Sequence, residues 1–309
     1  MKKILFILST SVLMSTSVLA QTTTPTTTPT TTPTETPKQE NFDKKFRFGL
    51  RATPQPSWLK SDNTGSKGSG AVFGFGFGLT MEFKLSDIIH FQTGIGGDFE
   101  GGWITYRNDA EFNANLVVDK ENNMVEAKDG LKYSEYELVN GSTQYIMSER
   151  KYKSTFVTLP AMLKMMTQEY SGMKYFMMFG GEIGIRAGIK GNDTYAQGIK
   201  TTVTGTAAPV TATVTELTRA NINLGKDASA APFRVGMNLG LGTEYRIAGS
   251  TSLVMSVNYF QSFTNLMRKD SDFLTKGADN TYGADGYNFA PLTQGLTARA
   301  IRINIGIMF

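Results

Sequence analysis

The amino-acid sequence predicts an all-β fold, an eight-stranded antiparallel transmembrane β-barrel of the up-and-down type with long extracellular loops and short periplasmic turns. Three observations predict it. The 309-residue chain is rich in Gly (32), Phe (20) and Tyr (12), a composition that favours strands and turns. Several segments alternate apolar and polar residues with the two-residue period of a strand. The connections between these segments are alternately long and short, as in outer-membrane barrels.

Two segments precede the predicted barrel. Residues 1–20 carry Lys2 and Lys3, then an apolar stretch that ends at Ala20, which is the pattern of a secretory signal peptide. In residues 21–43 the repeat TTTP occurs three times, and its prolines block helix and sheet pairing. We expect a disordered Thr/Pro-rich periplasmic spacer there and the barrel in residues 44–309. The absence of Cys excludes a disulfide framework and a cysteine-linked lipid anchor.

Eight segments show the alternation of a membrane-crossing strand. The clearest is 71–84, where Phe73, Phe75 and Phe77 alternate with glycines that exclude a helix. An even number of strands is typical of single-chain bacterial barrels. The eight segments are 46–54, 71–84, 89–106, 153–167, 173–190, 233–247, 251–267 and 297–309.

The last segment has the pattern of a final barrel strand. Four isoleucines from Ile301 to Ile307 share one face with Phe309, at which the sequence stops. We interpret Phe309 as the signal that the barrel-assembly machinery recognises during biogenesis. A half-buried strand of a soluble sandwich is the alternative, but such strands rarely place bulky apolar residues outward at their very end.

The connections provide an independent test of the barrel. Long ones should lie outside the cell, and short ones, with both chain termini, in the periplasm. Asn140-Gly141, flanked by 133–139 and 143–152, is a hairpin signal that indicates strand material rising above the membrane. A ten-stranded barrel that uses this hairpin stays open as an alternative. The short connections are 85–88, 168–172 and 248–250, and the long ones are 55–70, 107–152, 191–232 and 268–296.

Charged residues on the inward face of the predicted strands indicate a salt-bridged lumen. A barrel of eight strands is just wide enough for its own side chains, so we expect a plugged interior rather than a pore. A proton or ion path lined by carboxylates is the alternative. Pro160 lies mid-strand, where it removes a hydrogen-bond donor from the ladder. We expect either a bulge there or a water molecule in the lumen that bonds to the carbonyl group left without a donor. The charged residues are Arg47, Arg51, Glu82, Lys84, Asp98, Glu100, Lys164, Glu182, Arg186, Arg234, Glu244, Arg246 and Arg302.

Aromatic residues gather near the ends of the predicted strands. Such residues form girdles at the two membrane interfaces of a barrel, and we interpret them as anchors rather than as ligand sites. On segment 173–190, the alternation of apolar and polar residues places Ile189 on the outward face with the other lipid-facing residues. The girdle residues are Trp58, Trp103, Tyr106, Tyr245, Tyr259 and Phe309.

The sequence contains no recognisable enzyme site. His90 is the only histidine, and it follows a short turn without a serine nucleophile close in the pattern, so a structural role is expected. The motif GFGFG at 74–78 lies inside a strand and opens no helix, which excludes a dinucleotide fingerprint. We predict no catalytic, cofactor-binding or metal-binding residues. The formal net charge of +4 does not indicate a nucleic-acid partner.

Three stretches together resemble the PorT-like outer-membrane barrels of Bacteroidetes. They are FRFGLRATPQPSWLK at 46–60, the Gly/Phe strand at 71–84, and FVTLPAMLKMM at 156–166, in which Val157 to Lys164 match a strand pattern that contains Pro160. The resemblance covers most of residues 44–309. It implies an outer-membrane protein and an accessory role in type IX protein secretion or gliding.

Two functional hypotheses follow. The first is a non-enzymatic envelope protein that acts on secretion or envelope proteins as well as contacting the lipid bilayer. The second is a surface receptor or adhesin that binds an extracellular ligand through loops 107–152, 191–232 and 268–296. A narrow channel is a third possibility.

Overall fold

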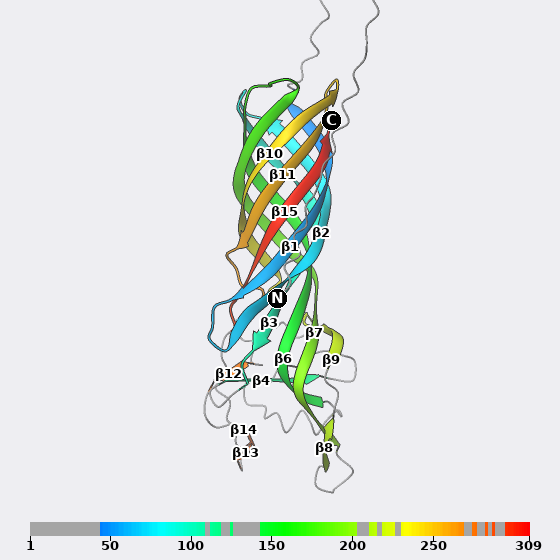
Figure 1. Ribbon diagram of the computed structural model, residues 1–309, viewed down its shortest axis with the longest axis vertical. Helices are drawn as coiled ribbons and strands as arrows, with labels where there is room; N and C mark the ends of the chain where they lie inside the picture. Colours follow the sequence, from blue (N-terminus) through cyan, green and yellow to red (C-terminus); the bar gives the residue numbers. More distant parts are fainter. Residues whose placement is uncertain are drawn as a thin grey trace, which may run out of the picture. The chain divides into compact units, whose positions relative to one another are not determined.

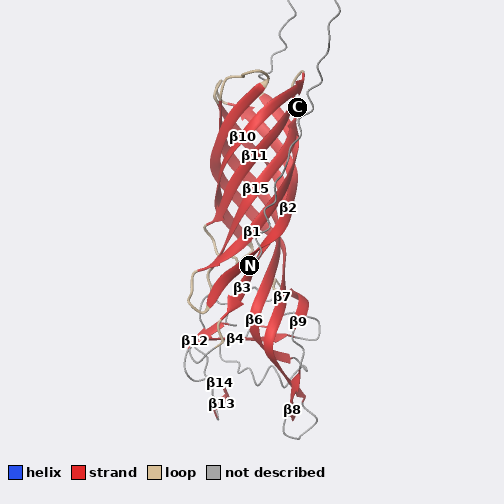
Figure 2. Ribbon diagram, in the orientation of Figure 1, coloured by secondary structure: helices blue, strands red, loops and turns tan. Residues whose placement is uncertain are grey.

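A closed antiparallel β-barrel forms the membrane-crossing part of the protein (Figures 1 and 2). The computed structural model describes residues 44–108, 112–118, 124–125, 143–202, 210–214, 218–225, 230–268, 274–276, 282–283, 286–287 and 294–309. In these residues no helix is long and apolar enough to cross a membrane.

Eight strands make the barrel wall, and each pairs antiparallel with the next. The wall closes because the first strand, β1, pairs with the last, β15. The eight-stranded prediction is therefore confirmed. The wall strands are β1 (Phe46–Ser61), β2 (Ser66–Lys84), β3 (Ile89–Tyr106), β6 (Thr143–Met166), β7 (Met173–Thr202), β10 (Phe233–Ala248), β11 (Thr251–Ser262) and β15 (Leu296–Met308).

Three tight turns join wall strands at one end of the barrel. They connect β2 to β3, β6 to β7 and β10 to β11, where the sequence places its short connections. Gly172 (φ 78°) and Gly249 (φ 51°) adopt the left-handed conformation that glycine allows without strain. Phe309 lies at the same end, and its amide donates to the carbonyl oxygen of Phe48 at 2.8 Å. Both ends of the barrel chain therefore meet at the turn end.

The opposite end continues as an extension beyond the barrel wall. β6 has 24 residues and β7 has 30, whereas the other wall strands have 12 to 19. Short strands pair with these two or with each other beyond the wall (Figure 1). The short strands are β4 (Phe112–Val118), β5 (Met124–Val125), β8 (Val210–Val214), β9 (Thr218–Asn223), β12 (Leu274–Lys276), β13 (Tyr282–Gly283) and β14 (Gly286–Tyr287).

The extension corrects two expectations. Residues 55–61, 66–70 and 191–202 are strand, although the sequence pattern places them in loops, whereas 143–152 are strand as the neighbouring hairpin signal indicates. The ten-stranded alternative is wrong, because the wall closes with eight strands. β4 pairs with β6 only in the extension, beyond the wall. Asn140-Gly141, which suggested that alternative, lies outside the described residues.

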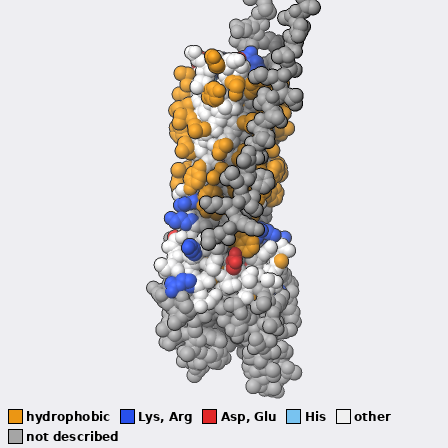
Figure 3. All heavy atoms as spheres, in the orientation of Figure 1, with side chains coloured by type: hydrophobic (Ala, Val, Ile, Leu, Met, Phe, Trp, Pro, Cys, Tyr) orange, Lys and Arg blue, Asp and Glu red, His pale blue; other side chains and the backbone are white. Residues whose placement is uncertain are grey.

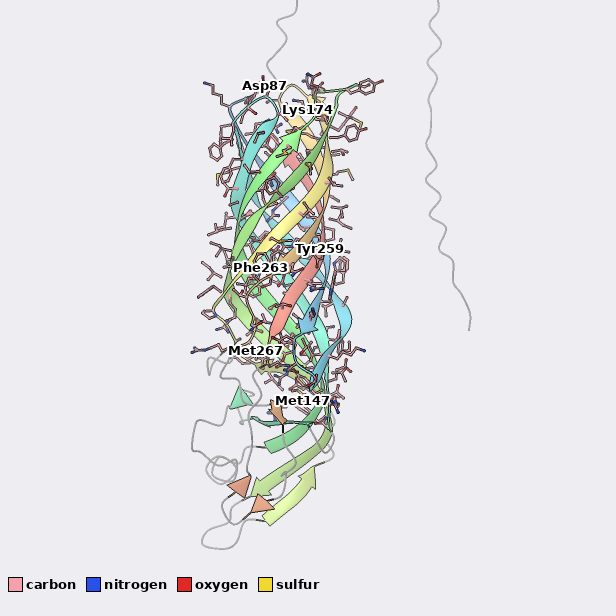
Figure 4. The ribbon with its side chains drawn as sticks, turned by 90° about the vertical axis from the view of Figure 1, so that its left-hand side faces the viewer. Asp87, Met147, Lys174, Tyr259, Phe263 and Met267 are labelled. Carbon is pink, nitrogen blue, oxygen red and sulfur yellow. The ribbon has the colours of Figure 1, made fainter. Side chains whose placement is uncertain are left out.

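Apolar side chains cover the outside of the wall. On β2 the residues Phe73, Phe75, Phe77 and Leu79 are all exposed, as the alternation predicts. The same face of β15 exposes its four isoleucines. Figure 3 shows hydrophobic side chains as an orange band around the visible face of the wall, and Figure 4 places Asp87 and Lys174 at the turn end, with Tyr259 and Phe263 near the other edge of the wall. The band matches what a lipid-embedded surface requires.

One bulge reverses the alternation of β7. The β6–β7 register shifts between Thr155 and Phe156, which pair with Gly188 and Arg186 respectively. A one-residue shift turns every following side chain to the other face. Ile189 is therefore buried rather than lipid-facing, which corrects the expectation from the sequence.

Pro160 causes no bulge in the β3–β6 pairing, which corrects one of the two expectations for this position. The β3–β6 register is the same on both sides of it, and only the ladder pairs between Thr158 and Ala161 are missing. The hydroxyl group of Thr93 donates to the carbonyl oxygen of Pro160 at 2.7 Å. A side chain from β3 thus satisfies the carbonyl group of Pro160 in the gap of the ladder.

Candidate functional site

The lumen contains a turn-side cluster of ionic groups made by Arg47, Glu82, His90, Lys164 and Glu244. Arg47 forms ion pairs with both glutamates. Lys164 Nζ lies 2.8 Å from Glu82 Oε2 and 3.0 Å from Glu244 Oε2. All five side chains are buried. Two cations face two carboxylates, so the cluster is close to neutral, which is the condition for keeping charges inside a low-dielectric interior.

His90, the single histidine of the chain, belongs to this cluster. Its Nδ1 atom lies 2.8 Å from Glu82 Oε1, and the ring is 5% exposed. The alternation of β3 places His90 on the inward face, so the sequence contained the signal although the predicted charge network omitted this residue. In the part of the chain that the structure describes, no His, Cys, Asp or Glu residues gather as a metal site would require.

A central cluster follows further along the lumen, made by Asp98, Glu100, Glu182, Arg234 and Arg302. Arg302 Nη1 lies 2.6 Å from Glu182 Oε2, and its Nη2 lies 3.4 Å from Asp98 Oδ2. Arg234 pairs with Glu100 and lies 3.2 Å from Glu182 Oε1. All five side chains are buried. The lumen at this level is therefore occupied by protein.

Neighbouring residues complete the central cluster. Gln55 Oε1 accepts a hydrogen bond from Arg302 Nε at 2.9 Å. Gly76 leaves space for Asp98, because a Cβ atom at this position would collide with the carboxylate oxygen Oδ1 of Asp98. Arg51, on the inward face of β1, lines a cavity of about 40 Å³ between the two clusters. That volume holds a few water molecules and no larger solute.

Aromatic rings cover the central cluster on the side of the extension. The guanidinium carbon of Arg234 lies 4.2 Å from the ring centre of Phe156 and 4.5 Å from that of Phe260, and Arg302 lies 4.2 Å from Phe260. Both rings belong to a buried apolar core that continues into the extension. Stacking on a ring face favours a desolvated guanidinium group. Charge clusters and rings together fill the lumen.

The remaining predicted charges lie outside the two clusters. Lys84 Nζ lies 2.8 Å from Asp87 Oδ1 at the turn end. Arg246 pairs with Glu169 at 2.6 Å on the same rim, where both side chains are about one-third exposed. Arg186 donates to the carbonyl oxygen of Ala230 at 2.6 Å. These three residues contact the ends of the wall rather than the middle of the lumen.

A second polar network holds the base of the extension, beyond the lipid-facing band. Arg150 and Asp193 form a fully buried bidentate pair, with both N–O distances 2.7 Å. The hydroxyl oxygens of Tyr106 and Tyr152 lie 2.7 Å apart, and Gln294 donates to Tyr106 at 3.0 Å. Burial raises the pKa of Tyr106 well above its ordinary value of 10.0. The network links β3, β6, β7 and the start of β15.

Tyr106 is therefore not a girdle residue, which corrects the sequence interpretation. Its side chain is 4% exposed and points inward, since even-numbered residues of β3 face the interior. Trp58, Trp103 and Tyr259 are half-buried, and Tyr245 and Phe309 are exposed. The ring of Phe309 lies 5.7 Å from that of Phe48, so the two ends of the barrel chain also contact each other through aromatic groups.

The closed antiparallel wall with its apolar outer band defines an outer-membrane β-barrel protein. A family described as "Outer membrane protein beta-barrel domain" matches residues 20–268, and the chain belongs to that family. No curated protein matches the sequence.

Several solved structures are similar to the chain at low identity. Neisserial surface protein A has 8% identity and a TM-score of 0.35, with 86% of this chain and 96% of that chain covered. OprG from Pseudomonas aeruginosa has 11% identity and a TM-score of 0.34, with 85% and 94% covered. Ail, the attachment invasion locus protein of Yersinia pestis, has 8% identity and a TM-score of 0.27, with 86% and 100% covered.

Proposed function

We propose that this chain is a non-enzymatic outer-membrane barrel that conducts nothing through its lumen and acts on other proteins through its extension and loops. The observation that carries the proposal is the filled interior, in which two ionic clusters and the rings of Phe156 and Phe260 occupy the lumen. A protein that transports no solute must act through its surfaces. Among the described residues, β6, β7 and the strands that pair with them form the structure that extends beyond the wall.

The proposed orientation places the turn end and both termini in the periplasm, with the extension outside the cell. Short turns at one end and longer strands and loops at the other support this orientation. A signal peptide at 1–20 and a periplasmic spacer at 21–43 agree with it. The outer-leaflet side of the wall is then the edge near Trp58 and Trp103.

An accessory role in type IX protein secretion or gliding is the first candidate, and it rests on the resemblance of 46–60 and 156–166 to PorT-like barrels. A surface receptor or adhesin is the second, and the specific observation in its favour is the extension. β6 and β7 remain hydrogen-bonded to each other as far as the Thr143–Lys200 pair. A protein whose role lay in the periplasm would have no need of so long a paired structure on the far side.

The test compares a deletion strain with strains that carry trimmed variants. Loss of secreted proteins from the medium on deletion supports the secretion role. Loss of binding to an extracellular ligand when residues 109–142 or 269–293 are replaced by short linkers, but not when the 21–43 spacer is removed, supports the receptor role. Trypsin treatment of whole cells should cleave only on the extension side. Stepwise single-channel conductance of the purified protein in planar bilayers would contradict the blocked lumen.

A further inference from the structure

The outer surface of the wall is hollowed at two neighbouring seams near the edge of the lipid-facing band. β1 and β2 pair as far as Trp58 and Ala71, but β1 then continues against β15 alone. Between β2 and β3 the register shifts, and residues 71–74 have no ladder partner on β3. Inside the wall, the Ser57 hydroxyl group bonds to the amide and the carbonyl oxygen of Gly101 at 2.8 and 3.0 Å. The lumen therefore stays closed, and the gaps in the strand pairing leave two hollows on the outer surface, which we call the first and the second notch.

The first notch, between β1 and β2, has a volume of about 470 Å³ and is lined by three cations, Lys60, Lys67 and Arg299. None of its lining residues is acidic, and Trp58 is among them. Among the described residues, Arg299 Nε is buried without a hydrogen-bond partner. A buried, unsatisfied donor beside two lysines is a site for an anion with several acceptor oxygens.

The second notch, between β2 and β3, has a volume of about 490 Å³ and combines apolar and basic groups. Phe73, Phe75 and Phe99 line one part of it, and Lys151 and Lys153 line another. Phe73 is 76% exposed. The one acidic residue of the lining, Glu100, is buried and pairs with Arg234 inside the lumen.

Two lysines at this edge lie directly opposite each other. Lys153 of β6 pairs in register with Lys190 of β7, and both side chains are exposed. Like charges in opposite positions of neighbouring strands destabilise a sheet. No ion pair relieves either lysine in the part of the chain that the structure describes. An arrangement that costs stability in the bare protein is explained if an anion lies between the two ammonium groups.

The cations lie on five of the six neighbouring strands that run from β15 through β1, β2, β3 and β6 to β7. In Figure 3 Lys and Arg side chains gather directly below the orange apolar band. On the two remaining strands, β10 and β11, and just after β11, the outward residues at this edge are Phe233, Gln261 and Phe263. Both tryptophans of the chain flank the notches, and Lys151 Nζ lies 5.0 Å from the ring centre of Trp103. Tryptophan is typical of the bilayer–water interface, so the cations lie where lipid headgroups begin.

We propose that this basic rim, made by Lys60, Lys67, Lys151, Lys153, Lys190 and Arg299, binds a phosphate-bearing glycolipid of the outer leaflet. Phosphate groups lie between the cations, and an acyl chain lies in the second notch against Phe73, Phe75 and Phe99. The assignment to the outer leaflet rests on the orientation proposed above. The binding chemistry itself does not depend on that orientation, because it requires only a phosphorylated lipid at this edge of the wall.

The test is a lipid titration of the refolded full chain in detergent, followed by native mass spectrometry. The probes are diphosphoryl lipid A and the same lipid after removal of its phosphates. Two double variants remove the proposed contacts, Lys60→Gln/Lys67→Gln and Lys153→Gln/Lys190→Gln. The matched control, Lys44→Gln/Lys45→Gln, removes two exposed charges at the turn end. A boiled-versus-unboiled gel shift selects folded protein for every variant.

Each rim double variant should weaken binding of the phosphorylated lipid by roughly 25-fold, since each cation at an anionic lipid surface contributes about fivefold. The control should bind as the wild type does, and dephosphorylated lipid should bind weakly to all of them. In detergent without phosphorylated lipid, Lys153→Gln/Lys190→Gln should resist urea at least as well as the wild type. Equal binding of both lipids, or an equal loss in the control, would overturn the proposal.

Whole-cell trypsin treatment separates this inference from the proposed function. If the protease shows the extension in the periplasm while lipid binding keeps its dependence on the rim cations, the orientation is wrong and the binding site stands. If the orientation holds but binding ignores the cations, the site is wrong and the proposed function is unaffected.

Discussion

Glu82 offers the sharpest test of the filled lumen, because three buried donors depend on it. Its carboxylate accepts from Arg47, from Lys164 Nζ at 2.8 Å and from His90 Nδ1 at 2.8 Å. The substitution Glu82→Gln keeps the shape of the side chain and removes its charge. Arg47 and Lys164 then share the single carboxylate of Glu244, and the turn-side cluster carries an uncompensated positive charge.

The expected loss follows from these contacts. Removing one partner from a buried ion pair costs about 3–5 kcal/mol, because the other charge stays buried without compensation. The amide oxygen of the substituted side chain would still accept one hydrogen bond, which keeps the loss below the sum of three charge-assisted bonds of roughly 1.5–3 kcal/mol each. We therefore expect the free energy of unfolding to fall by about 3–5 kcal/mol.

The assay is urea unfolding of the refolded chain in detergent, followed by tryptophan fluorescence and by the gel shift. The control is Glu169→Gln, the same chemical change in the Arg246–Glu169 pair, whose side chains are 32% and 29% exposed. Pairs of that kind contribute about 0–1 kcal/mol. Equal losses in the two variants would mean that water reaches Glu82 freely, and the blocked lumen would have to be abandoned.

Three further predictions concern other parts of the wall and the extension. Arg150→Met should lower the unfolding free energy by about 3–5 kcal/mol in urea, and Arg150→Met/Asp193→Leu should recover most of the loss, because no buried charge then stays unpaired; a double variant as unstable as the single one would contradict this. Gly76→Ala should cost about 1–3 kcal/mol by crowding Asp98, while Gly188→Ala, where a Cβ atom meets nothing within 4 Å, should be neutral in the same assay. Since burial raises the pKa of Tyr106 in the folded state, its contribution to stability is complete below about pH 10 and is lost as the pH rises toward the folded value. Urea midpoints should therefore fall above pH 10 and fall less steeply in Tyr106→Phe, and an unchanged slope in that variant would exclude Tyr106 as the cause.

The barrel wall is predictable from the sequence because lipid and lumen impose opposite demands on neighbouring residues. Segment 71–84 shows this best, since every second residue must be apolar and the others must fit a narrow interior. The same alternation of apolar and polar residues predicts that Glu82 and Lys164 face the lumen. Which charges pair does not follow, because the pairs join strands that are distant in sequence, as in Arg47 with Glu244.

Prediction fails where the wall leaves the lipid. In residues 147–152 the inner face meets a protein core, with Met147, Arg150 and Tyr152 buried, so the apolar-out signal of the wall disappears although the strand continues, and only the Asn140-Gly141 hairpin signal indicated strand there. Ile189 is misplaced for a different reason. A bulge adds one residue to β7, and nothing in the local sequence marks where the phase changes. Tyr106 could have been placed correctly, since the parity of β3 puts it inward with His90.

The long β6–β7 ladder has a mechanical consequence. A partner attached to the tip of the extension pulls roughly along the two strands, so the hydrogen bonds between them are loaded in shear and share the force. The same pull on a single loop would open bonds one after another. The buried Arg150–Asp193 pair fastens the base of this ladder, and the load passes on into a closed ring of eight strands held in the bilayer. This load path is what the receptor or adhesin role proposed above would require of the extension.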